Sequence, residues 1–154
     1  MKNLLLLPAI LASLVAAAIA QAPTAALAGG IGNNYIAPSV SFGGGQTAFG
    51  VDGKFGIADN ISLRPYVYFP SAGTQFGGSV TYDWDLRQAS LPITPFIGLG
   101  VSFQTGNNNG STGYAQAGAD LNISENIALL GAVGIPFGNN NFSTAVTLGA
   151  GLRF

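Results

Sequence analysis

The sequence predicts an all-β chain, a transmembrane antiparallel up-and-down β-barrel of eight strands that follows an N-terminal signal peptide. Three observations lead to this prediction. An apolar segment with small-residue cleavage sites opens the chain, the remainder alternates apolar with small or polar residues in segments of about ten, and aromatic residues recur where those segments end. The 154 residues suffice for one domain of this kind.

The composition restricts the functions that the chain can have. It is 48% hydrophobic and 7% charged, whereas about 25% of the residues in ordinary soluble domains are charged. The formal net charge of −1 gives no basic surface for nucleic acid. The chain has no cysteine and no histidine, and so lacks thiolate metal ligands and the commonest general base. We therefore expect no enzymatic activity, no cofactor and no metal.

The first 28 residues have the pattern of a secretory signal peptide. Lys2 supplies the positive charge, Leu4 to Ala20 form the apolar run, and Ala18-Ile19-Ala20 and Ala26-Leu27-Ala28 are small-x-small cleavage sites. An uncleaved membrane anchor fits less well, because the run is short and rich in alanine. We predict cleavage after Ala28, with Ala20 as the alternative, and a barrel domain over 29–154.

The first four segments place apolar side chains on one face of each expected strand and small or polar ones on the other. We assign the apolar face to lipid, because transmembrane strands alternate lipid-facing and lumen-facing side chains. The lipid-facing sets are Ile36, Pro38, Val40 and Phe42; Phe49, Val51, Phe55 and Ile57; Ile61, Leu63, Pro65, Val67 and Phe69; and Phe76, Val80, Tyr82, Trp84 and Leu86.

The last four segments repeat this scheme. Their lipid-facing sets are Ile93, Pro95, Ile97, Leu99, Val101 and Phe103; Ala115, Ala117, Ala119, Leu121 and Ile123; Ile127, Leu129, Val133, Ile135 and Phe137; and Phe142, Val146, Leu148, Ala150, Leu152 and Phe154. Residues that favour tight turns (Gly, Asn, Asp and Ser) separate all eight segments. The even strand number agrees with bacterial single-chain barrels.

Aromatic residues gather at the two expected rims of the barrel. At the rim shared by the ends of odd strands and the starts of even strands, the outward residues are Phe42, Phe49, Phe69, Phe76, Phe103, Phe137 and Phe142. Tyr82 and Trp84, with Phe55 and Phe154, lie toward the opposite rim. Two aromatic girdles around an aliphatic band match the two interfaces of a bilayer.

The same alternation points six charged side chains into the lumen: Asp52, Lys54, Arg64, Asp83, Asp120 and Arg153. All lie in the half nearer the turns at Asp59 and Glu125. A lumen of eight strands is only wide enough for side chains to fill, so we expect these charges to pair in a neutral salt-bridge network. A gated path for protons or ions through the same charges is the alternative.

The other half of the lumen is lined by glycines and small polar residues, with Tyr66, Tyr68 and Tyr114 among them. We expect the glycines to let tyrosines from facing strands fill this space. A water-filled vestibule open to the outside is the alternative.

The chain ends on a strand that carries Leu148, Ala150, Leu152 and Phe154 at alternate positions. In this it resembles bacterial outer-membrane barrels, and over 29–154 it is similar to the small eight-stranded family of the outer-membrane protein A and X type, often labelled porin-like. The resemblance implies an outer-membrane location, contact with outer-membrane lipid, a monomer, and recognition of the C-terminal strand by the barrel-assembly machinery. The outer loops expected here are shorter than that family tends to carry.

The sequence favours a non-enzymatic barrel with a structural or surface-interaction role in the envelope. A narrow passive pore for water, ions or very small solutes is the first alternative. The second is a soluble barrel of the lipocalin kind that holds an apolar ligand inside. That arrangement would need polar side chains outside and apolar ones inside, which the scarcity of charge disfavours.

Overall fold

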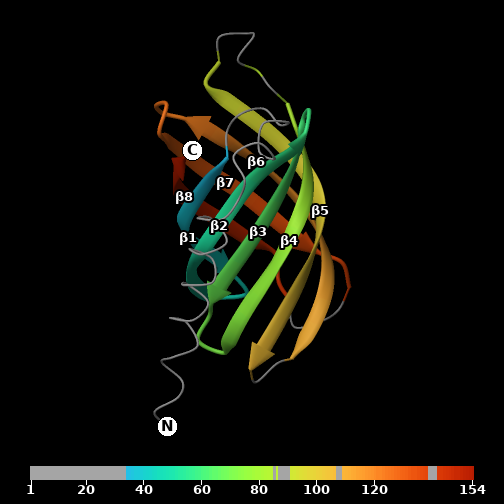
Figure 1. Ribbon diagram of the computed structural model, residues 1–154. Coiled ribbons are helices and arrows are strands. Elements are labelled where there is room, and N and C mark those ends of the chain that lie inside the picture. The colour runs from blue at the N-terminus through green and yellow to red at the C-terminus, as the bar shows by residue number, and fades with distance from the viewer. Residues whose placement is uncertain (1–33, 85, 87–90, 107–108, 139–141) are drawn as a thin grey trace.

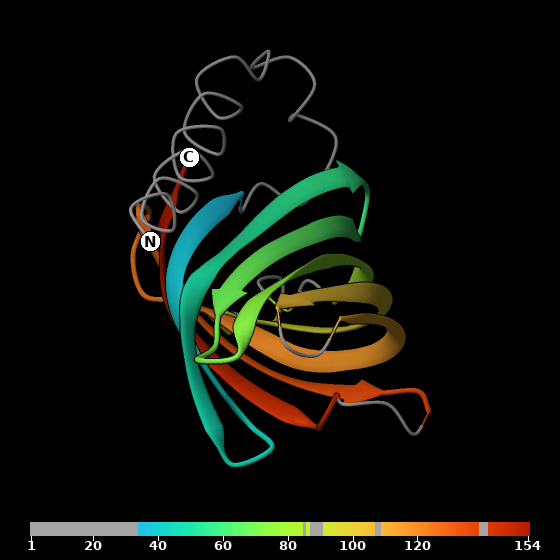
Figure 2. The same ribbon diagram turned by 90° about the horizontal axis from the view of Figure 1, so that it is seen from below.

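The computed structural model describes residues 34–84, 86, 91–106, 109–138 and 142–154. Over these residues eight antiparallel strands close into one barrel, in which each strand pairs with its neighbours in sequence and β1 pairs with β8 (Figures 1 and 2). The strands are β1 (Tyr35–Gly43), β2 (Gln46–Ala58), β3 (Ile61–Phe69), β4 (Gly73–Asp83), β5 (Ile93–Gly106), β6 (Gly110–Asn122), β7 (Ile127–Pro136) and β8 (Ala145–Arg153). The predicted fold class and strand number are confirmed.

The predicted signal peptide and both of its cleavage sites lie outside the described residues. Within the described ranges, no helix is long and apolar enough to cross a membrane.

The barrel has two different rims. The mouth rim carries the β1–β2, β3–β4, β5–β6 and β7–β8 connections, and the terminal rim carries the other three connections and the end of β8. In the β1–β2 turn, Gly44 and Gly45 have φ angles of 57° and 74°. Two successive left-handed residues make the turn that best matches the twist of a hairpin, and glycine adopts them without steric cost.

The two faces of the sheet separate side chains as the alternation predicts. In β5, Thr94 and Phe96 are buried in the lumen, whereas Ile97, Leu99 and Val101 are exposed on the outer wall. The other strands also expose large apolar residues outside, and inside they bury polar and charged side chains together with a small apolar cluster that includes Leu130 of β7. This polarity excludes the lipocalin-like alternative, which requires the reverse, and it suits a bilayer as the surrounding solvent.

Six of the seven phenylalanines predicted for the mouth girdle are exposed on the outer wall: Phe42, Phe49, Phe69, Phe76, Phe103 and Phe137. Phe76 and Phe103 stack with their ring centroids 5.5 Å apart. At the terminal rim, Tyr82 and Trp84 are exposed and meet edge to face at 5.2 Å.

The placement of Phe142 in this girdle is wrong. β8 begins at Ala145 rather than at Phe142, so the period-two rule of a strand does not reach residue 142. Phe142 instead lines the hollow at the mouth of the barrel, beside Ser143.

Candidate functional site in the barrel lumen

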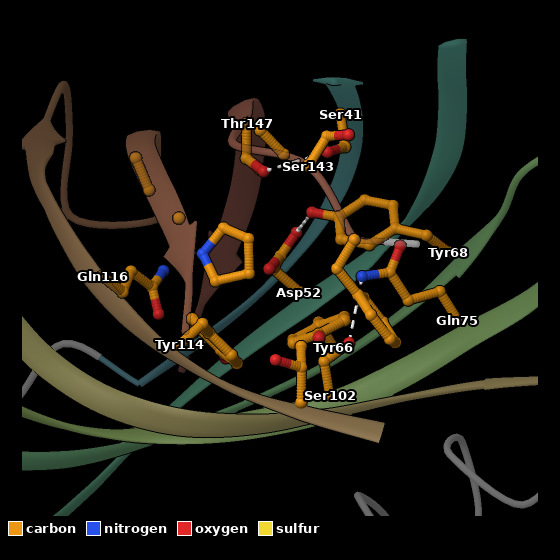
Figure 3. Close-up of a pocket in the computed structure, with 16 residues that line it drawn as sticks. Ser41, Asp52, Tyr66, Tyr68, Gln75, Ser102, Tyr114, Gln116, Ser143 and Thr147 are labelled. Atoms are coloured by element: carbon orange, nitrogen blue, oxygen red, sulfur yellow. Dashed lines mark hydrogen bonds between the residues drawn. The ribbon is translucent and has the colours of Figure 1, made fainter. Parts of the chain in front are cut away.

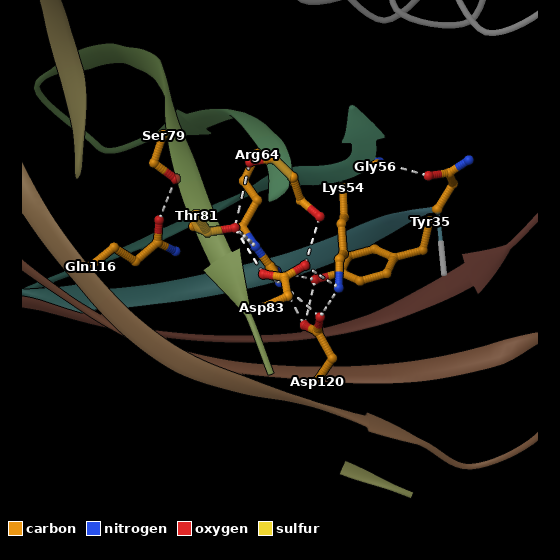
Figure 4. A network of polar contacts seen from close by, with 11 residues as sticks. Tyr35, Lys54, Gly56, Arg64, Ser79, Thr81, Asp83, Gln116 and Asp120 are labelled. Atoms are coloured by element: carbon orange, nitrogen blue, oxygen red, sulfur yellow. Dashed lines mark hydrogen bonds and ion pairs between the residues drawn. The ribbon is translucent and has the colours of Figure 1, made fainter. Parts of the chain in front are cut away.

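Two cations and two carboxylates meet across the lumen in the half nearer the terminal rim. The Lys54 Nζ atom lies 2.9 Å from Asp83 Oδ2 and 2.8 Å from Asp120 Oδ2, and Arg64 Nη2 lies 2.8 Å from Asp120 Oδ2 and 3.4 Å from Asp83 Oδ1 (Figure 4). The four residues come from β2, β3, β4 and β6, and each is at most 4% exposed. We call them the charge network; its formal charges cancel.

Neutral side chains complete the coordination of these charges. The Tyr35 hydroxyl donates to Asp120 Oδ1 at 2.8 Å and accepts from Arg64 Nη1 at 2.9 Å. The Thr81 hydroxyl accepts from Arg64 Nε at 3.1 Å and donates to Asp83 Oδ1 at 2.9 Å. Because burial makes an unpaired charge costly, such partners decide whether an ion-pair network can exist in a lumen.

Aromatic rings pack around the same charges. The guanidinium carbon of Arg64 lies 3.5 Å from the centroid of the Phe96 ring, which is a cation–π contact between two buried side chains. Phe96 and Tyr35 are among the largest fully buried side chains. Both contact Arg64 and lie at the level of the charge network.

Sequence reasoning assigned neither Tyr35 nor Phe96 to the site. Tyr35 directly precedes the first expected segment, and extending its alternation by one residue would have turned Tyr35 inward. Phe96 stands between the outward Pro95 and Ile97, so its inward position followed from the period of two. Because Phe96 is as apolar as its outward neighbours, its residue type does not mark it as part of the lumen.

The structure brings together four of the six charges predicted for the lumen network, and places Asp52 and Arg153 elsewhere. Asp52 lies closer to the mouth, where Oδ2 accepts hydrogen bonds from Ser39 Oγ at 2.5 Å and from the Tyr68 hydroxyl. It is two residues from Lys54 along β2, a rise of about 7 Å, so the two inward side chains reach different levels of the lumen. Arg153 lies at the terminal rim and donates to the Ser124 carbonyl oxygen at 2.9 Å.

Three tyrosines occupy much of the mouth half of the lumen. Tyr66 has its ring centroid 5.4 Å from that of Tyr68 and 6.1 Å from that of Tyr114. Each tyrosine lies over a glycine of a neighbouring strand, as Tyr114 does over Gly100, where an added Cβ would come within 2.7 Å of Tyr114 Cζ. Tyr68 lies in the same way over Gly50, and the Tyr66 hydroxyl oxygen lies 2.9 Å from where a Cβ of Gly77 would be. Glycines thus provide the room that these rings occupy.

Even so, the tyrosines do not fill the mouth half completely. A cavity of about 70 Å³ remains between Tyr66, Tyr68 and Tyr114, with Asp52 in its wall (Figure 3). A second hollow of about 120 Å³ lies at the mouth rim and shares with it the lining residues Ser41, Gln75, Phe142, Ser143 and Ala145. We call the two together the vestibule. The inner part alone has room for a few water molecules.

Comparison with known proteins bears on the fold. No protein-family model matches the chain, and no curated protein matches it in sequence. The N-terminal β-barrel domain of Pseudomonas aeruginosa OprF matches at a TM-score of 0.61 and 15% identity, over 80% of this chain and 98% of that domain. Neisserial surface protein A matches at a TM-score of 0.53 and 14% identity, over 79% and 95% of the two chains.

The chain has the fold of a small transmembrane β-barrel. A de novo designed transmembrane β-barrel also matches, at a TM-score of 0.60 and 18% identity, over 80% of this chain and 96% of the design. At identities of 14–18%, the likeness to these natural and designed barrels is one of fold.

Proposed function

We propose that this protein is an integral outer-membrane barrel with a non-enzymatic structural or surface-interaction role, and that its lumen does not conduct. The observation that supports this is the charge network, whose four side chains are at most 4% exposed and pack against Phe96 and Tyr35. Ions would have to displace paired, dehydrated charges to pass this level.

The outer wall supports residence in a membrane. Aliphatic side chains form its middle and aromatic rings its two rims, as a bilayer with two interfaces requires. We propose that residues 1–28 direct export and are removed, and that the barrel acts as a monomer in contact with outer-membrane lipid. Mass spectrometry of the protein from a purified outer-membrane fraction tests location and cleavage together.

Conductance in a planar lipid bilayer tests the closed lumen. We expect the refolded protein to give no current above that of the bare bilayer, while a general porin inserted in the same way conducts. The matched variant is Arg64→Ala with Asp83→Ala, which removes one cation and one anion and so keeps the lumen neutral while emptying part of the network. We expect that variant to conduct. Stepwise currents from the parent protein would contradict the proposal.

A narrow passive pore is the second candidate, and the vestibule is the observation that favours it. The vestibule extends inward from the mouth rim, and Asp52 is part of the lining of its inner cavity. A pore would need this path to continue past Arg64 and Phe96. Parent currents that disappear when a bulky side chain narrows the vestibule would favour this candidate.

A further inference from the structure

Asp52 is a carboxyl group of the lumen that the charge network does not include. Lys54 and Arg64 are each paired with Asp83 and Asp120, so the charge network is neutral without it. Both hydrogen bonds to Asp52 reach Oδ2, and the described residues offer no hydrogen-bond donor to Oδ1. Only 9% of Asp52 is exposed, and it forms part of the cavity wall. Among the described residues, no lysine or arginine lies within ion-pair distance of this buried carboxyl group.

The remainder of the vestibule suits a positive charge. Tyrosine rings, hydroxyl and amide groups and several small apolar residues line it, and none of the described residues that line either hollow is a lysine or an arginine. Aromatic rings attract cations through their negative faces, and this attraction grows when water is excluded. The hydroxyl oxygens of Ser41, Thr147 and Tyr68 are acceptors within the same lining.

We propose that the vestibule binds a small organic ammonium ion that enters from the mouth rim, with Asp52 as its counter-ion and the three tyrosines as its walls. The ammonium group would donate to Asp52 Oδ1, the atom without a donor. Since an apolar cavity of about 150 Å³ holds benzene, the inner cavity of about 70 Å³ fits an ammonium group with one or two carbons. A longer stem would extend into the hollow at the mouth.

Other classes of ligand fit less well. Calcium and magnesium require several oxygen ligands with more than one carboxylate as a rule, and the described residues contain no group of three or more acidic, histidine or cysteine side chains placed to hold a metal. An anion would be repelled by Asp52. A neutral solute would not pair with an ionised Asp52, whose desolvation in the lumen is costly.

An NMR titration of the refolded, isotope-labelled barrel in neutral detergent micelles tests the proposal. Ethylammonium chloride is the probe, and ethanol and sodium acetate are the uncharged and anionic controls, all in a constant background of sodium chloride. We expect saturable shifts in the backbone amide signals of Gly50, Gly77 and Gly100 with ethylammonium. Saturation by ethanol at the same concentrations, or no saturable shift with ethylammonium, would overturn the proposal.

Variants locate the site. Asp52→Asn keeps an acceptor for Ser39 and Tyr68 but removes the charge, and we expect the affinity for ethylammonium to fall about tenfold or more. Asp59→Asn makes the same change at the exposed β2–β3 turn and serves as the matched control. Equal affinities of these two variants for ethylammonium would show that Asp52 is not its counter-ion.

A second variant tests the proposal even if Asp52→Asn does not fold. Gly134 lines the inner cavity, and a Cβ there would have Tyr114 Cδ2 as its nearest neighbour, at 3.8 Å. Gly134→Val therefore takes up room in the cavity and leaves Asp52 unchanged. We expect it to weaken ethylammonium binding while the barrel keeps its heat-modifiable gel mobility. Unchanged binding in a folded Gly134→Val barrel would place the ion outside the vestibule.

Discussion

Arg64 Nη2 lies 2.8 Å from Asp120 Oδ2 and joins β3 to β6 across the lumen. These strands are not neighbours in the sheet, so the contact links the two sides of the barrel directly. The same guanidinium also reaches Asp83, Tyr35 and Thr81. Arg64 is therefore the side chain on which most of the charge network depends.

Removing Arg64 should destabilise the barrel strongly. In Arg64→Ala, Asp120 and Asp83 keep only Lys54 as a cationic partner, and breaking a buried ion pair costs about 3–5 kcal/mol. Unfolding in urea, followed by the fluorescence of Trp84, the single tryptophan of the chain, measures the change. Arg153→Ala at the terminal rim is the control and should cost far less. If the Arg64→Ala barrel resists urea as well as the parent does, the charge network does not stabilise the barrel.

The Tyr35 hydroxyl should contribute measurably to stability. It bridges Arg64 and Asp120 with two short hydrogen bonds, and hydrogen bonds to charged groups contribute about 1.5–3 kcal/mol each. Tyr35→Phe keeps the ring and removes the bridge, so we expect a loss of that order in the same urea experiment. Tyr82→Phe loses only the exposed contact with Asn60, and it should behave like the parent.

The glycines beneath the tyrosine rings should not tolerate a side chain. An added Cβ at Gly100 would come within 2.7 Å of Tyr114 Cζ and 2.8 Å of Ser79 Cβ, and overpacking of this kind costs about 1–3 kcal/mol. Gly131→Ala is the matched control, because its Cβ would meet only Leu148 Cδ2 at 3.8 Å. We expect the unfolding temperature, measured from heat-modifiable gel mobility, to fall for Gly100→Ala and to stay unchanged for Gly131→Ala.

The C-terminal residue should matter for assembly in the cell more than for the folded barrel. Leu148, Leu152 and Phe154 are exposed on the outer wall at alternate positions, in line with Ala150. If the assembly machinery recognises this strand, Phe154→Ala should lower the amount of this protein in the outer membrane and raise its amount in the periplasm. Refolding of the purified variant in detergent should be nearly unchanged, since Phe154 touches Phe55 with ring centroids 6.4 Å apart at the surface. Equal loss in both assays would indicate a stability defect instead.

The sequence by itself determined the number of strands and which face of each strand is apolar. A period of two assigns each side chain to lipid or lumen without reference to any other strand. Val67 and Tyr68 were therefore placed on opposite sides of the wall from local pattern alone. For the same reason the alternation alone turns Lys54, Arg64, Asp83 and Asp120 into the lumen.

Only the tertiary structure decided which of these inward side chains meet. The level of a residue in a barrel depends on strand tilt and on the stagger between strands, and neither is visible in a one-dimensional pattern. This is why Asp52 lies near Tyr68 rather than in the charge network, and why Arg153 reaches a carbonyl at the terminal rim. The position of Phe142 could not be predicted from the alternation either, because the period of two holds only where neighbouring strands keep the chain extended.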